Sequence, residues 1–276
     1  MPRSTRGIPA GRVVGINTAI LSPSGQSVGI GFALPSATAK AVVDDLMHFG
    51  EVHRGWLGVD VQPLTSDLAR QLHVQSMKKG VVVSNVTKFG PAQEAGLRAG
   101  DVITRFDEKP VRQVRDLLRF IAETRVRKRV EVAFLRDGKS QTVWLTVGEL
   151  QRDDSDTGEP AADEKEKKTD LRPALPVGSL GLSLSSLTPD VRSMHRIPVR
   201  VKGVMVMEAA TGSAAAGQGI RAGDVIVEAN RQAVTEPEDV ERAISEVRKR
   251  NDGSKLLLRV YTKGHTRFFA IDVGQS

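Results

Sequence analysis

Residues 97–103 read Leu-Arg-Ala-Gly-Asp-Val-Ile, and residues 220–226 read Ile-Arg-Ala-Gly-Asp-Val-Ile. The two stretches lie 123 positions apart, and the same offset relates residues 57–111 to residues 180–234 without a gap. The units of solenoid proteins are shorter, about 20–50 residues each. This register therefore predicts two copies of one small domain, joined by a linker.

Each copy carries an Ala-Gly-Asp turn before an apolar strand, at Gly100-Asp101 and again at Gly223-Asp224. Glycine adopts backbone angles that other residues avoid, and an aspartate side chain can hold such a turn through nearby backbone amides. Around this turn the sequence predicts, in the first copy, strands at 57–63, 80–86 and 101–106, short helices at 66–72 and 91–97, a longer helix at 111–125, and a hairpin of 130–136 and 141–147 across Asp137-Gly138. In the second copy the hairpin is displaced by about three residues.

Composition excludes several classes of function. The chain has 276 residues and a net charge of +7, but its 40 basic residues are interleaved with 33 acidic ones and only 4% are aromatic, so nucleic-acid binding is not expected. It contains no cysteine, which rules out disulfides, thiolate-bound zinc and a thiol nucleophile. No apolar run approaches the roughly 20 residues that a membrane-spanning helix needs. No cofactor or metal is expected, because none of the histidines has a metal-ligand spacing; they are His48, His53, His73, His195 and His265.

No large apolar side chain occurs between Gln151 and Asp170. A segment of this kind cannot offset its ordering entropy by burial, so it predicts a flexible, charge-mixed linker. The chain is accordingly divided into residues 1–54, a first copy at 55–149, a linker at 150–177 and a second copy at 178–274.

The order of elements in each copy resembles that of a PDZ domain. PDZ domains bind extended peptides by strand addition and often capture a free C-terminal carboxylate. In the permuted bacterial form the carboxylate loop is an apolar-Leu-Gly-apolar sequence before the first strand. The resemblance therefore implies peptide-binding residues in these loops, namely Trp56, Leu57, Gly58 and Val59 in the first copy and Leu180, Gly181 and Leu182 in the second.

The long helix of each copy would form the far wall of the groove. Val114, Leu118 and Ile121 share one helix face in the first copy, although plain core packing would give the same stripe. The equivalent residues of the second copy are Pro237, Glu241 and Ile244. Because proline and glutamate make that wall less apolar, a peptide site is expected in the first copy and is in doubt in the second.

The first fifty residues resemble a larger family. Residues 11–20 read Gly-Arg-Val-Val-Gly-Ile-Asn-Thr-Ala-Ile, residues 27–36 read Ser-Val-Gly-Ile-Gly-Phe-Ala-Leu-Pro-Ser, and residues 53–59 read His-Arg-Gly-Trp-Leu-Gly-Val. This pattern is similar to the end of the trypsin-like domain in the Do/HtrA family of serine proteases, which is followed there by PDZ domains. The resemblance implies a mainly β chain with short helices (α+β): the remnant of a trypsin-like β-barrel and then two permuted PDZ domains.

A catalytic triad is not expected in this chain. The family's Gly-Asn-Ser-Gly-Gly motif would fall near position 2, which is Pro2, and nearby Ser4 has no flanking glycines. Residues 1–10 do not resemble the family and lack the apolar stretch of a signal peptide. The chain is therefore expected to be the C-terminal part of such a protease, from a truncated or disrupted gene or a shortened version.

The leading hypothesis is a tandem PDZ module that binds peptide C-termini or extended segments of misfolded proteins. By family resemblance it would act in the periplasm, in protein quality control. The alternatives are a serine endopeptidase that acts with missing protease residues or full-length protomers, and a structural module of an assembly. Monomers or weak association are expected. Without a barrel to pack into, the apolar side chains of residues 1–50 are expected to be exposed and prone to aggregation.

Overall fold

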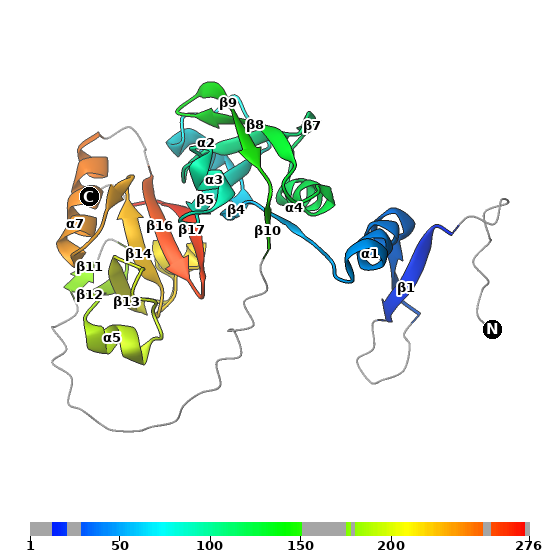
Figure 1. Ribbon diagram of the computed structural model, residues 1–276. Coiled ribbons are helices and arrows are strands. Elements are labelled where there is room, and N and C mark those ends of the chain that lie inside the picture. Colours follow the sequence, from blue (N-terminus) through cyan, green and yellow to red (C-terminus); the bar gives the residue numbers. More distant parts are fainter. Residues whose placement is uncertain (1–12, 21–28, 151–174, 178–179, 251–254, 274–276) are drawn as a thin grey trace.

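The computed structural model describes residues 13–20, 29–150, 175–177, 180–250 and 255–273. Strands predominate and the helices are mostly short, which confirms the predicted fold class. Figure 1 shows a small N-terminal unit, the first copy and the second copy, with the two copies in contact. Most of the predicted linker lies outside the described residues. Within the described residues, no helix is both long enough and apolar enough to cross a membrane.

The N-terminal unit consists of β1 (Gly15–Ile20), β2 (Gly31–Pro35) and α1 (Ser36–Phe49). Among the described residues, these two strands pair only with each other, in an antiparallel register. Pro35 holds the N-cap position of α1 and makes no side-chain capping hydrogen bond. The helix ends at Gly50, whose φ of 77° is left-handed.

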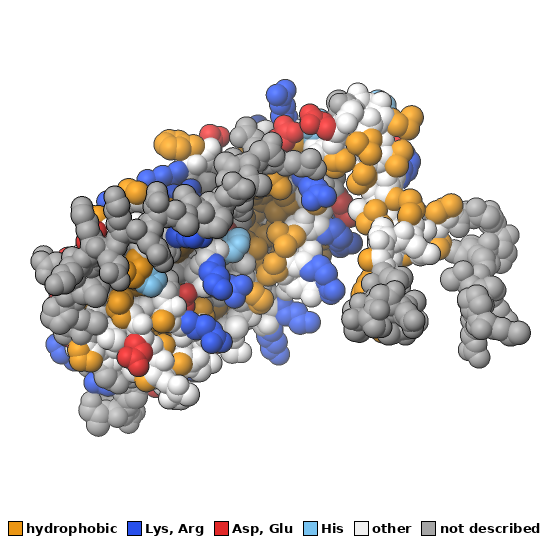
Figure 2. Space-filling view, turned by 90° about the horizontal axis from the view of Figure 1, so that it is seen from below, with side chains coloured by type: hydrophobic (Ala, Val, Ile, Leu, Met, Phe, Trp, Pro, Cys, Tyr) orange, Lys and Arg blue, Asp and Glu red, His pale blue; other side chains and the backbone are white. Residues whose placement is uncertain are grey.

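Apolar side chains of this unit face solvent. A two-stranded sheet is too small to bury them, and Figure 2 shows hydrophobic surface over this part of the molecule. The expectation of exposed side chains in residues 1–50 is met over the described part, at Val13, Val14, Ile16, Ile30, Phe32, Val43, Leu46 and Met47.

The first copy is a sheet in the order β4-β5-β6-β8-β9, packed against helix α4. Its elements are β3 (Gly55–Trp56), β4 (Val59–Pro63), α2 (Ser66–Gln71), β5 (Val81–Val86), α3 (Pro91–Glu94), β6 (Val102–Phe106), β7 (Lys109–Pro110), α4 (Val114–Glu123), β8 (Arg129–Arg136), β9 (Lys139–Thr146) and β10 (Gly148–Glu149). The helices α3 and α4 are shorter than predicted. The turn at Asp137-Gly138 has positive φ at both residues, as the predicted hairpin requires.

The second copy repeats this arrangement in the order β11-β12-β13-β14-β16-β17. Its elements are β11 (Leu175–Val177), β12 (Leu182–Ser186), α5 (Pro189–Met194), β13 (Val204–Ala209), α6 (Ala214–Gln218), β14 (Val225–Ala229), β15 (Gln232–Ala233), α7 (Pro237–Arg250), β16 (Leu256–Thr262) and β17 (His265–Ile271). The turn at Lys263-Gly264 is 126 positions after Asp137-Gly138, which confirms the three-residue displacement. One correction concerns the linker: its last three residues, predicted to be flexible, form β11.

The two copies share a buried interface that the sequence analysis did not predict. Side chains of β17 alternate, so Phe268 and Ala270 point away from their own core and pack against the outer face of the first copy. The resulting cluster joins three residues of the second copy to six of the first: Leu257, Phe268 and Ala270 with Leu68, Ala69, Leu72, Val74, Val82 and Val102. Because both faces of β17 are buried, the copies form one docked body.

Polar contacts surround this cluster. The Gln62 side chain accepts from the Phe268 amide at 2.7 Å and donates to the Phe268 carbonyl at 3.1 Å. Lys255 donates to Asp67 at 2.8 Å, and this contact, followed by one from Arg70, lowers the pKa of Asp67.

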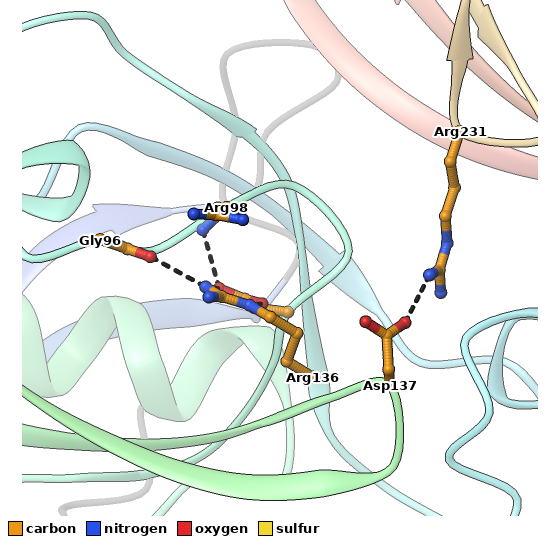
Figure 3. Close-up of polar contacts among 6 residues, drawn as sticks. Gly96, Arg98, Arg136, Asp137 and Arg231 are labelled. Carbon is orange, nitrogen blue, oxygen red and sulfur yellow. Dashed lines mark hydrogen bonds and ion pairs between the residues drawn. The ribbon is translucent and has the colours of Figure 1, made fainter.

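A second ion pair bridges the copies further along the interface. Arg231 of the second copy reaches Asp137 in the hairpin turn of the first (Figure 3), and it lowers the pKa of that carboxyl group. These charges fix the orientation in which the apolar surfaces meet.

Candidate peptide-binding site

The predicted carboxylate loop of the first copy joins β3 to β4. Leu57 is 2% exposed and anchors the loop in the core of the first copy, while Gly58 has a φ of 74°. A Cβ atom at Gly58 would lie 3.1 Å from the Trp56 ring, so the tryptophan covers this glycine closely. The positive φ turns the backbone between two otherwise extended segments, which is the reason for glycine at this position.

Hydrogen bonds to its carbonyl groups fix the loop in place. The Leu57 carbonyl accepts from the Ala92 amide at 2.9 Å, and the Gly58 carbonyl accepts from the Thr87 amide at 2.8 Å. Outside the strand ladders, the amides of Leu57 and Gly58 donate to no acceptor in the described part of the chain. Successive amides of this kind form a cradle for an anion such as a carboxylate.

Strand β4 carries the residues that follow the loop and has an open edge. It pairs with β5 on one side, and within the described residues no strand pairs with its other side. Val59 packs against the core from this strand. Helix α4 lies against β4, so the open edge and the helix face the same space. An extended peptide can add to such an edge through backbone hydrogen bonds.

The predicted helix stripe divides into three environments. Ile121 is buried in the core, Val114 is partly buried against it, and Leu118 is 54% exposed. The interpretation of the stripe as core packing therefore holds for Ile121, and the groove interpretation is compatible with Leu118. Val114 lies at the first residue of α4, between the two.

The start of α4 is fixed by a capping box. Asp116 accepts from the backbone amides of Arg112 and Gln113, both at 3.2 Å. Burial alone would raise the pKa of Asp116, but the contacts with the Gln113 side chain and with these amides lower it overall. Asp239 holds the equivalent place in α7, where backbone hydrogen bonds lower its pKa in the same way. Both long helices are thus capped at their N-terminal ends.

The Gly-Asp turn of the first copy is locked by an arginine from the hairpin. The Asp101 carboxylate is buried and accepts a hydrogen bond from the Arg98 amide at 2.7 Å. It also accepts hydrogen bonds from two guanidinium nitrogens of Arg136, each at 2.7 Å. Arg136 also donates to the Gly96 carbonyl at 2.8 Å (Figure 3). In the second copy Asp224 accepts from the Arg221 amide at 2.9 Å, and Thr262 occupies the position of Arg136 in the displaced hairpin.

The loop of the second copy has the same local shape. Leu180 and Leu182 are buried, Gly181 has a φ of 65°, and the Gly181 carbonyl accepts from the Ala210 amide at 2.8 Å. These three predicted site residues therefore occupy the same places as their counterparts in the first copy. The edge of β12, however, is covered by β11.

The facing helix of the second copy differs from the expectation. Pro237 begins α7 and is buried together with Ile244, whereas Glu241 is only partly exposed. The proline acts as the first residue of the helix, a position that it tolerates well, and is not part of a polar wall. Sequence reasoning also missed β11; the sole signal was the apolar Leu-Pro-Val at the end of an otherwise polar segment.

Comparison with known proteins places both copies in one family. A sequence profile described as "PDZ domain" matches residues 55–147 and 178–273. Over 268 residues, 96% of this chain, the sequence is 38% identical to a protein of Brucella suis biovar 1 (strain 1330) named "Probable periplasmic serine endoprotease DegP-like". A protein of the same name from Rhizobium meliloti (strain 1021) is 39% identical over 267 residues, also 96% of this chain.

The matched regions cover 48% and 50% of those two proteins, so the chain spans about half the length of the curated relatives it matches. A solved structure titled "HtrA-type protease AlgW with decapeptide" is 40% identical over 51% of this chain and 43% of that one, with a TM-score of 0.46.

Proposed function

Because the chain belongs to the PDZ domain family and is similar along 96% of its length to DegP-like serine endoproteases, we propose that its first copy binds peptides for such a protease. The ligands are apolar C-termini or extended segments of misfolded proteins, and the setting is protein quality control in the periplasm. The observation that carries this proposal is the open edge of β4 beside the Leu57-Gly58 loop.

The binding mode follows from that geometry. A peptide adds to β4 as an antiparallel strand and ends at the loop, where the amides of Leu57 and Gly58 donate hydrogen bonds to its terminal carboxylate. Its last side chain lies between β4 and α4, where Leu118 supplies an exposed apolar contact. Trp56 shields the loop glycine and limits the space beside it.

The test is a titration with a fluorescein-labelled peptide that ends in a free valine, compared with the same peptide as a C-terminal amide. The free acid is expected to bind at least tenfold more tightly, and Leu118→Arg is expected to remove this binding by placing a charge in the groove. Leu46→Arg is the matched control, because it makes the same change at a similarly exposed leucine in α1. Equal affinity of acid and amide, or equal loss in both variants, would refute carboxylate capture in this groove.

A second candidate function is endopeptidase activity of the whole protein, which is favoured because the relatives are named serine endoproteases. In this proposal the first copy selects segments that a protease domain cleaves, alone or in an assembly with other protomers. Casein digestion by this chain, with and without a serine-protease inhibitor, measures how much activity resides in these 276 residues. Inhibitor-sensitive cleavage by this chain would place the active centre within it and contradict the peptide-binding role as its principal one.

A further inference from the structure

The groove of the second copy already holds a strand. Strand β11 lies beside β12 (Figure 1) and pairs with it in antiparallel orientation. In this pairing Leu175 is opposite Leu184 and Val177 is opposite Leu182. β12 corresponds to β4 through the 123-residue offset, so β11 covers the edge that is open in the first copy. Antiparallel addition to this edge is how an extended peptide binds a PDZ domain.

Two side chains of β11, those of Pro176 and Val177, alternate as those of a bound peptide would. Val177 is 2% exposed and belongs to the buried cluster that includes Val240, Ile244 and Val247 of α7. The preceding residue, Pro176, is exposed. Val177 is therefore buried on the core side of the sheet while its neighbour is exposed, which is the alternation that an added strand shows.

The carbonyl group of Val177 also engages the loop. The Leu180 amide donates to it at 3.1 Å, whereas the equivalent Leu57 amide of the first copy has no such acceptor among the described residues. The loop amide that would meet a ligand's terminal oxygen is thus already used by the chain itself.

In the first copy the equivalent segment does not pair with β4. The offset places residues 52–54 at the position of β11, but the Arg54 carbonyl accepts from the Leu150 amide at 2.9 Å and the next two residues pair with β10. This pairing draws the chain away from β4. The two copies therefore share a loop and a helix but differ in what occupies the groove.

We propose that Leu175-Pro176-Val177 is an intrachain ligand of the second PDZ copy and keeps its groove closed. The groove takes an extended aliphatic segment whose backbone continues beyond the buried residue, not one that ends there in a carboxylate. Because β11 is tethered to its own domain, a competing peptide must overcome a high effective concentration. This inference concerns the second copy and does not depend on peptide binding by the first.

Pro176 suits this role. Proline within a sheet is confined to edge strands, since it cannot donate to the ladder, and β11 is the edge of its sheet. A strand that lacks this donor is also a poor template for another strand. The segment closes the groove without creating a new edge that could pair with another strand.

The experiment uses the full chain with Leu118→Arg, which silences the first groove. Val177→Asp is added to expel β11, and Val199→Asp, at an 88% exposed valine of the same copy, is the matched control. Amide hydrogen exchange at Leu182 and Leu184 is expected to accelerate at least tenfold with Val177→Asp and to stay unchanged with Val199→Asp. Protection at Leu258 in the core of the second copy reports that the domain is still folded.

The probe is a labelled, C-terminally amidated peptide with the sequence of residues 170–179. It is expected to bind the Val177→Asp chain at least tenfold more tightly than the Val199→Asp chain, and to restore protection at Leu182. Unchanged exchange would show that β11 does not cover β12, and faster exchange without peptide binding would show that β11 is not a ligand of the groove; either result overturns the proposal. If Val177→Asp unfolds the domain, Val177→Ala replaces it, with a smaller acceleration expected from the lost contacts.

Discussion

Phe268→Ala is expected to undock the two PDZ copies while leaving each of them folded. Phe268 is 6% exposed because it packs on the first copy, on the face of β17 that points away from its own core. Its backbone amide and carbonyl are held by Gln62, and alanine retains both hydrogen bonds. The substitution therefore removes packing between the copies and little else.

The size of the effect follows from that packing. Truncating a buried phenylalanine to alanine costs about 3–5 kcal/mol. Here the loss falls on the docking equilibrium, because the undocked second copy would expose Phe268 in any case. At about 1.4 kcal/mol for each factor of ten, the ratio of docked to undocked chains falls by roughly 10²- to 4 × 10³-fold.

The assay is energy transfer between two dyes. The chain has no cysteine, so Lys88→Cys in the first copy and Glu238→Cys in the second, both exposed, provide a specific labelling pair. Transfer efficiency is expected to fall with Phe268→Ala and to be retained with Phe269→Ala, whose side chain packs on the core of the second copy instead. Phe269→Ala should lower the unfolding temperature of that copy. Unchanged transfer in the Phe268→Ala chain, or an equal fall in both, would refute the docked arrangement.

The same dye pair tests the charges at the interface. The pKa values of Asp67 and Asp137 are lowered from 3.8, so their stabilisation is complete above that pH and is lost as the pH falls through the folded-state values. Transfer should decline below about pH 4, and a chain with Asp67→Asn and Asp137→Asn should lack this step; an identical pH profile would contradict the assignment. For the Gly-Asp turns, Asp101→Ala is expected to destabilise the first copy by about 3–5 kcal/mol, because it leaves the largely buried Arg136 without its carboxylate partner. Asp224→Ala is expected to destabilise the second copy by about 1–3 kcal/mol, because Asp224 accepts from a backbone amide and has no such arginine among the described residues. Denaturation followed by tryptophan for the first copy and by the single tyrosine for the second measures both, and equal losses would count against the role of the arginine.

The sequence alone determined the duplication, the turns and the fold class. Its repeated Gly-Asp and the Asp137-Gly138 hairpin specify backbone conformations that few other residues adopt, so they could be predicted locally. The loop glycines at 58 and 181 are indicated by the resemblance to PDZ domains, and both have positive φ. The loop of the candidate site could therefore be located from the sequence, while its role in peptide binding stays a prediction.

The tertiary structure decided what surrounds those elements. Leu118 and Ile121 are both apolar and share one helix face, yet one is exposed and the other buried. Phe268 and Phe269 are adjacent and of the same type, yet Phe268 packs against the first copy and Phe269 packs on the core of the second. An apolar side chain favours burial but does not specify the surface that covers it, because the hydrophobic effect has no direction. For this reason neither the docking of the copies nor the pairing of β11 with β12 could be predicted from the sequence.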